Sequence, residues 1–137
     1  MQIGLLALNI IVLLCLSGCS RANPSEYYYL THPAQLEKKL ALCAKAPKQG
    51  MHDPVCKTAS RAYEKMQNLQ IHAQQFPQQF GETIIQTQLK IAQMKQQIHH
   101  MKSQQSNTKK LTKLQQKLKQ LQQQYHIYMK IIAMQGV

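Results

Sequence analysis

The segments IIQTQLKIAQMKQQIHHM (residues 84–101) and LTKLQQKLKQLQQQYHIYMKII (residues 111–132) decide the fold of this chain. In both, apolar side chains recur at alternating steps of three and four residues. This spacing lines them along one face of an α-helix and is typical of a coiled-coil seam. The seam positions are Ile84, Ile91, Met94, Ile98 and Met101, then Leu111, Leu114, Leu118, Leu121, Tyr125, Tyr128 and Ile132. We therefore predict an all-α protein.

The segment between the two seams, KSQQSNT (residues 102–108), contains no apolar side chain, and the seam changes phase across it. We predict that residues 82–137 form a long antiparallel helical hairpin, a coiled coil whose helices span about 81–102 and 107–134. One long helix with a phase shift, dimerising in parallel, is the alternative, and the sequence does not separate the two. Self-association through the coiled coil is possible in either case.

The charge of the chain is strongly positive, with 17 Lys and Arg against 5 Asp and Glu and a formal net charge of +12. From Gln67 onward there are nine lysines and only one acidic residue, Glu82. Such a balance favours contact with anionic lipid, polysaccharide or nucleic acid without choosing among them. A solvated helix kept soluble by lysines is an equally good interpretation. Nucleic acid is not the expected partner, because an exported protein meets DNA only during transfer or uptake.

The amino-terminal run MQIGLLALNIIVLLCL (residues 1–16) is almost wholly apolar, yet it is shorter than the roughly 20 residues that a membrane-spanning helix needs. Leu16-Ser17-Gly18-Cys19 follows and matches the lipobox of bacterial lipoproteins at all four positions. We therefore predict a lipoprotein signal peptide at residues 1–18, lipidation of Cys19, and a lipidated tether at residues 19–24. The protein is expected at a cell membrane, lipid-anchored and periplasm-facing, with inner or outer membrane left open.

Residues 25–69 are predicted to form a small module of two helices joined by a turn. Thr31 or His32 can cap the first helix, and Pro33 suits its first turn. The segment 46–50 ends this helix, and Asp53-Pro54 begins the next. The apolar faces are formed by Leu36, Leu40 and Cys43, and by Cys56, Ala59, Tyr63 and Met66. Residues 70–81, which contain Pro77 and Gly81, are predicted to be a polar linker between this module and the coiled coil.

Cys43 and Cys56 lie thirteen residues apart, on helix ends that the turn brings together. In an oxidising periplasm they are best interpreted as a disulfide. Closing a loop of that size stabilises the fold by about 3 kcal/mol, which matters greatly for a small module. Two free buried thiols or a metal pair are the alternatives. No metal site or cofactor is predicted, because the histidines have no regular spacing relative to the cysteines.

The order of residues after the lipobox resembles the entry exclusion lipoproteins of conjugative elements, the EexN and TrbK-like group. The residues that carry the resemblance are Tyr27-Tyr28-Tyr29, Thr31-His32-Pro33, Leu36, Lys39-Leu40, Cys43, Pro47, Asp53-Pro54, Cys56 and Ala59. The resemblance covers roughly residues 19–69, and the long Gln- and Lys-rich tail departs from it. It implies a protein that blocks redundant DNA entry by a conjugative or type IV secretion system.

The mechanism that the resemblance implies is contact with a protein component of the conjugative transfer apparatus. Tyr27, Tyr28, Tyr29 and His32 are the expected partner-binding residues, because aromatic side chains are favoured at interface hot spots. Packing against the module is the alternative for any one of the tyrosines. An enzyme is not expected, because the chain has five acidic residues and no recognisable catalytic motif. A structural lipoprotein of the secretion apparatus is the alternative function.

Overall fold

The computed structural model describes residues 23–46, 50, 52–104 and 108–136. Over these residues the chain forms helices and no strand, which confirms the predicted all-α class. The helices are α2 (Glu26–Thr31), α3 (Pro33–Lys45), α5 (Pro54–Gln75), α6 (Pro77–Ser103) and α7 (Thr108–Met134). Among these helices none is both long and apolar enough to cross a membrane.

The tyrosine-rich start of the chain is itself a short helix, α2, which the sequence analysis did not distinguish. Ser25 caps it, because the Ser25 hydroxyl accepts a hydrogen bond of 3.1 Å from the Tyr28 N–H. The Thr31 hydroxyl donates back to the carbonyl of Tyr27 and so does not cap the next helix. His32 occupies the cap position of α3 without a side-chain cap hydrogen bond, and Pro33 begins that helix.

The predicted polar linker at residues 70–81 is wrong, since these residues are helical except for Phe76. Glutamine and histidine in this segment are compatible with a helix, so α5 continues to Gln75. The break comes from Pro77, which lacks an N–H and disfavours helical backbone angles in the residue before it. Phe76 has φ −132° and ψ 60°, and α6 begins at once with Pro77 as its first residue. The connection is therefore a one-residue corner.

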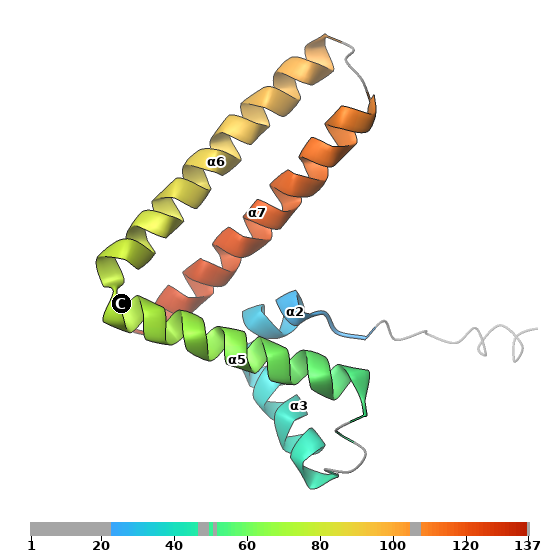
Figure 1. Cartoon of the computed structure of the whole chain (residues 1–137), viewed down its shortest axis with the longest axis vertical. Coiled ribbons are helices and arrows are strands. Elements are labelled where there is room, and N and C mark those ends of the chain that lie inside the picture. The colour runs from blue at the N-terminus through green and yellow to red at the C-terminus, as the bar shows by residue number, and fades with distance from the viewer. Residues whose placement is uncertain (1–22, 47–49, 51, 105–107, 137) are drawn as a thin grey trace, which may run out of the picture.

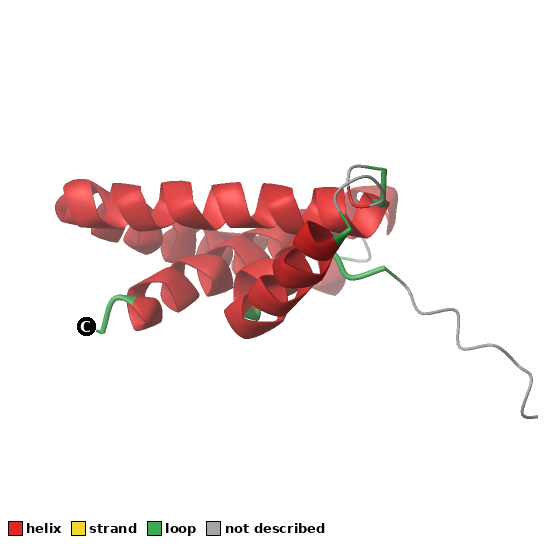
Figure 2. Cartoon of the chain, turned by 90° about the horizontal axis from the view of Figure 1, so that it is seen from below, coloured by secondary structure: helices red, strands yellow, loops and turns green. Residues whose placement is uncertain are grey.

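The five helices are arranged as a crossed base and a long pair (Figure 1). The base consists of α2, α3 and α5, with α2 and α3 lying against α5. The long pair consists of α6, which continues from the end of α5, and α7, which runs back alongside α6. Figure 2 shows the same helices from below. Residues 105–107, between α6 and α7 in the sequence, lie outside the described residues. The predicted signal peptide and the predicted lipidation site, Cys19, also lie outside them.

One hydrophobic core joins the two regions that the sequence analysis treated as separate domains. It contains residues from all five helices: Tyr29, Leu30, Leu36, Ala59, Ala62, Met66, Ala73, Phe80, Ile127, Tyr128 and Ile131. The last turns of α7 contribute Ile127 and Ile131, which lie outside the predicted seam and pack on the base of the molecule. Ile131 is completely buried. This extra apolar surface explains why the base and the long pair share a core.

Candidate functional site

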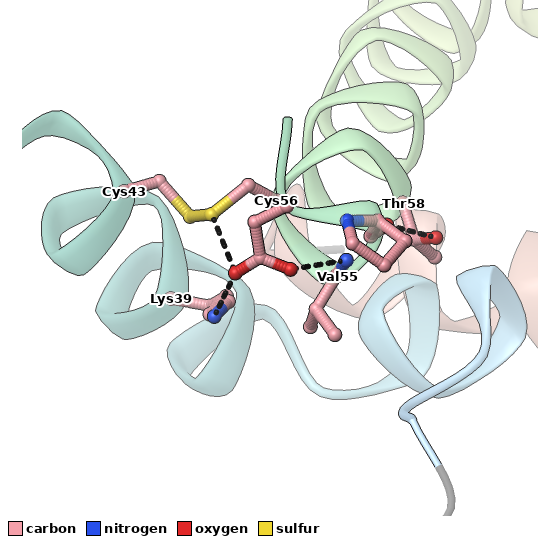
Figure 3. The surroundings of a disulfide bond; sticks show 7 residues. Lys39, Cys43, Val55, Cys56 and Thr58 are labelled. Atoms are coloured by element: carbon pink, nitrogen blue, oxygen red, sulfur yellow. Dashed lines mark hydrogen bonds and ion pairs between the residues drawn. A yellow bond between two sulfur atoms is a disulfide. The ribbon is translucent and has the colours of Figure 1, made fainter. Parts of the chain in front are cut away.

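The predicted disulfide between Cys43 and Cys56 is present and joins α3 to the first turn of α5 (Figure 3). The two Cα atoms are 5.9 Å apart, and thirteen positions separate the residues in sequence. Leu36 of α3 is completely buried in the core. The disulfide therefore attaches the carboxyl-terminal part of α3, which lies away from Leu36, to the start of α5.

Asp53 organises the surroundings of the disulfide (Figure 3). Its Oδ1 accepts a hydrogen bond of 2.7 Å from the Val55 N–H and so caps α5. Its Oδ2 accepts a hydrogen bond of 3.3 Å from the Lys39 ammonium group and lies 3.4 Å from Cys56 Sγ. The sulfur contact is not a hydrogen bond, because a disulfide sulfur carries no proton. The sequence predicted the cap, but not the ion pair with α3.

The pKa of Asp53 lies below its ordinary value of 3.8, chiefly because the Val55 N–H bonds the carboxylate and secondarily because of Lys39. The folded state therefore favours the ionised form. This stabilisation is complete above about pH 4 and is lost as the pH falls below 3.8 toward the lowered pKa.

We expect Asp53→Asn to unfold at a lower urea concentration than the wild type at pH 7, because asparagine keeps the cap but not the charge. The difference between the two midpoints should shrink below pH 4, and urea titrations followed by circular dichroism measure it. A difference that stays the same from pH 7 to pH 2.5 would show that the charge does not contribute.

Gly50 allows the chain to pass close to the disulfide. Its N–H donates a hydrogen bond of 2.7 Å to the Ala46 carbonyl. A Cβ atom placed on Gly50 would lie 2.9 Å from the carbonyl oxygen of Cys43, which is backbone and cannot move aside easily. From the sequence, the segment 46–50 is predicted only to end a helix. Its glycine is needed for this close approach.

Two of the predicted contact residues, Tyr28 and His32, form an exposed aromatic pair at the end of α2. Their ring centroids are 4.4 Å apart, and the ring planes differ by 18°, which is a stacked geometry. The His32 Nδ1 lies 2.9 Å from the Tyr28 carbonyl oxygen, which holds the ring over the helix end. The Tyr28 side chain is 37% exposed. We call these two residues the Tyr28–His32 pair.

Tyr29 is not exposed, contrary to the expectation for all three tyrosines. Its exposed fraction is 3%, and it belongs to the hydrophobic core. Burial raises the pKa of its hydroxyl, although nearby Lys39 partly opposes this shift. Successive helix positions point in different directions, so three adjacent tyrosines cannot share one face. Tyr29 therefore packs the base and is not a surface contact.

Tyr27 has a third environment, at the junction of α2 with α7. Its hydroxyl lies 2.8 Å from the Nδ1 of His126, 99 residues later in the chain. Beside it lies a cavity of about 300 Å³ between α2, α5 and α7, with an apolar floor that includes Leu30, Leu69 and Ile127. The rim carries glutamines of α7 and the ion pair between Glu26 and Lys65, whose charged atoms are 3.1 Å apart.

Within residues 23–46, 50, 52–104 and 108–136, no three His, Cys, Asp or Glu side chains lie close enough together to hold a metal ion. The Tyr28–His32 pair is exposed at the end of α2, and the cavity beside Tyr27 opens between α2, α5 and α7. Lipidation of Cys19 stays a prediction.

Comparison with known proteins finds no matching family model, no matching curated protein and no matching solved structure.

Proposed function

We propose that this chain is a membrane-anchored, periplasm-facing lipoprotein that blocks redundant DNA entry by a conjugative or type IV secretion system. Exclusion would operate through protein–protein contact. The observation that carries the proposal is the Tyr28–His32 pair, exposed on a base that a disulfide and a shared core hold together. The lipobox and the order of residues 27–59 support it from the sequence.

The lipid on Cys19 would keep this pair near the membrane. Six residues separate Cys19 from the start of α2 at Glu26. A fully extended chain spans about 3.5 Å per residue, so α2 would begin within about 25 Å of the anchor. A pair held in this range meets an incoming transfer apparatus where that apparatus reaches the membrane. Two or three acyl chains would make the attachment durable.

The contact would need no catalytic step. Stacked aromatic side chains present a large, rigid surface at little entropic cost, because the disulfide-linked base has already ordered them. A protein loop of the transfer apparatus could cover the Tyr28–His32 pair and place a side chain in the neighbouring cavity, beside Tyr27. Blocking an assembly surface in this way would stop uptake before DNA arrives.

We further propose that α6 and α7 form an antiparallel coiled-coil hairpin. Support comes from Ile91, Met94 and Ile98, which occupy seam positions of α6 and are each at most 9% exposed. A long helical pair also suits a scaffold, which favours a second candidate function. The chain would then be a structural lipoprotein of the secretion apparatus itself.

A mating experiment tests exclusion. The full chain is expressed alone in recipient cells, and transfer is counted from a donor carrying the matching element and from one carrying an unrelated element. Exclusion predicts fewer transconjugants from the matching donor only. Unchanged transfer from both donors would reject it.

If the chain is a scaffold of the secretion apparatus, it acts in the donor cell and not in the recipient cell. Deleting the gene from the donor should reduce transfer if the chain is part of the apparatus, and complementation in the donor should restore it. If transfer from the deletion donor is normal, the chain is not a required scaffold. The two experiments together therefore separate the two functions.

A further inference from the structure

The disulfide between Cys43 and Cys56 can be reached from outside the folded base. Cys43 is half-buried, whereas Cys56 is only 6% exposed. A cavity of about 120 Å³ opens beside the disulfide, and its lining includes Lys39, Asp53 and both cysteines. A small thiol that enters this cavity meets Cys43 Sγ first, because Cys43 is the more exposed of the two cysteines. The base therefore offers one particular sulfur to attack.

Attack on Cys43 Sγ makes Cys56 the leaving group. The attacking thiolate donates an electron pair to Cys43 Sγ, the bond between the two cysteine sulfurs breaks, and its electron pair goes to Cys56 Sγ. With a dithiol as reductant, the second thiol then loses its proton and attacks the mixed disulfide, which releases Cys43 as a thiolate and leaves the dithiol oxidised. The rate depends on how well Cys56 Sγ carries negative charge, because a thiol of lower pKa leaves faster.

The position of Cys56 would by itself favour its release. Cys56 is the third residue of α5, and the N–H groups and the dipole at a helix N-terminus stabilise a thiolate. In this protein the Asp53 carboxylate uses those N–H groups. It accepts a hydrogen bond of 2.7 Å from the Val55 N–H, and the N–H groups of Val55 and, more weakly, of Cys56 lower its pKa. A thiolate at Cys56 would therefore find these donors occupied.

Asp53 also places a negative charge where the charge of the leaving thiolate would form. Its Oδ2 lies 3.4 Å from Cys56 Sγ. Figure 3 shows this oxygen between the sulfur and the Lys39 ammonium group, whose Nζ is 3.3 Å from the oxygen. Lys39 therefore helps to hold the carboxylate beside the sulfur. Two negative charges so close together disfavour each other, so the carboxylate opposes formation of a thiolate at Cys56.

We propose that Asp53 protects the disulfide of the folded protein from reduction by thiols, because its carboxylate makes Cys56 a poor leaving group. The base would then keep α3 attached to α5 in the presence of dithiol reductants. This inference goes beyond exclusion, because it concerns the disulfide and not the Tyr28–His32 pair. Rates of reduction decide it, whatever the mating experiments give.

The test measures how fast dithiothreitol reduces the folded full chain in detergent at pH 7. Thiols that are already free are first blocked with N-ethylmaleimide. Samples quenched during the reaction are labelled with maleimide-linked polyethylene glycol, and the gel shift gives the reduced fraction. Asp53→Asn should raise the second-order rate constant by at least about threefold, because rates of thiol exchange change by about that factor per unit of thiol pKa. An unchanged rate constant would overturn the proposal.

Lys39→Gln separates protection of the disulfide from a weaker fold. Asp53→Asn breaks the ion pair with Lys39, and a base that opens more often is reduced faster whatever its local chemistry. Lys39→Gln breaks the same ion pair but leaves the carboxylate beside Cys56, without its counter-charge. Protection predicts that Lys39→Gln is reduced no faster than the wild type. Opening of the base predicts that both variants are reduced faster, and that result would overturn the proposal.

Two further measurements locate the effect at the disulfide. Glu26→Gln removes the same charge and breaks the ion pair with Lys65, away from the disulfide, so it should leave the rate constant unchanged. A rise equal to that of Asp53→Asn would show that only the net charge of the chain matters. In urea that unfolds both chains, the wild type and Asp53→Asn should be reduced at similar rates, because the fold no longer holds the carboxylate beside the sulfur. A difference that persists there would contradict protection by the folded geometry.

Discussion

The chain in which Cys43 and Cys56 are both replaced by alanine will lose about 3 kcal/mol of its free energy of unfolding, because the unfolded state regains the entropy of a loop of about this size. In the folded state the disulfide joins α3 to α5 across a Cα distance of 5.9 Å. Without it, α3 is held mainly by Leu36 and by the ion pair between Lys39 and Asp53. A side-chain pair exposed by 26% and 35% stabilises little by itself.

Urea unfolding followed at 222 nm measures this loss, and the chain contains no Trp that would provide a fluorescence signal instead. Reduction provides the matched control. Dithiothreitol should lower the midpoint of the wild type to near that of the double variant, and it should leave the variant unchanged. If the variant unfolds at the same urea concentration as the oxidised wild type, the disulfide does not stabilise the fold.

Phe80→Ala will destabilise the chain by about 3–5 kcal/mol, the usual cost of removing a buried aromatic side chain. Phe80 is 2% exposed and lies at the corner where α5, α6 and α7 meet. Its ring contacts Tyr128 edge to face at a centroid distance of 5.4 Å and His72 at 5.9 Å. The cavity left by alanine would therefore weaken the packing of the base against α6 and α7.

Phe76→Ala is the matched control, because Phe76 is the only other phenylalanine and is 48% exposed. It should change the midpoint little. Since the base shares one core with α6 and α7, Phe80→Ala should move a single cooperative transition without splitting it. Two separate transitions, with only one shifted by Phe80→Ala, would mean that the base and the pair of helices α6 and α7 are independent domains.

The features that could be predicted from the sequence are those that local patterns determine. Alternating steps of three and four residues predicted the helices at residues 84–101 and 111–132, because a helix repeats every 3.6 residues. The spacing of Cys43 and Cys56 between two proline-initiated helices predicted the disulfide. Pro33 and Pro54 marked the starts of α3 and α5 correctly, since proline is favoured in the first helical turn.

The features that could not be predicted depend on contacts between distant segments. The burial of Ile127 and Ile131 results from packing against α2 and α5, and their positions in the heptad place them outside the seam. The same contacts bury Tyr29 and bring Tyr27 to His126. The polar composition of residues 70–81 suggested a linker, yet composition alone does not end a helix, and only Phe76 leaves the helical conformation there.

The contact role of Tyr28 and His32 stays a prediction. Their stacking was not foreseen, although residues four apart lie on the same face of a helix. The cap that Asp53 forms on α5 was predictable from the Asp53-Pro54 pair. Its ion pair with Lys39 was not, because it depends on how the chain between α3 and α5 brings the two helices together.

We propose that the Tyr28–His32 pair blocks entry by contact, and mating into recipients that make variants of this pair tests that role. Tyr28→Ser with His32→Ser should restore transfer from the matching donor to the level of recipients lacking the protein. Tyr63→Ser should leave exclusion intact, because Tyr63 is 39% exposed, close to the 37% of Tyr28, but lies apart from the pair on α5. Immunoblots of membrane fractions check that all variants accumulate equally. Full exclusion by the double variant at normal abundance would contradict the account.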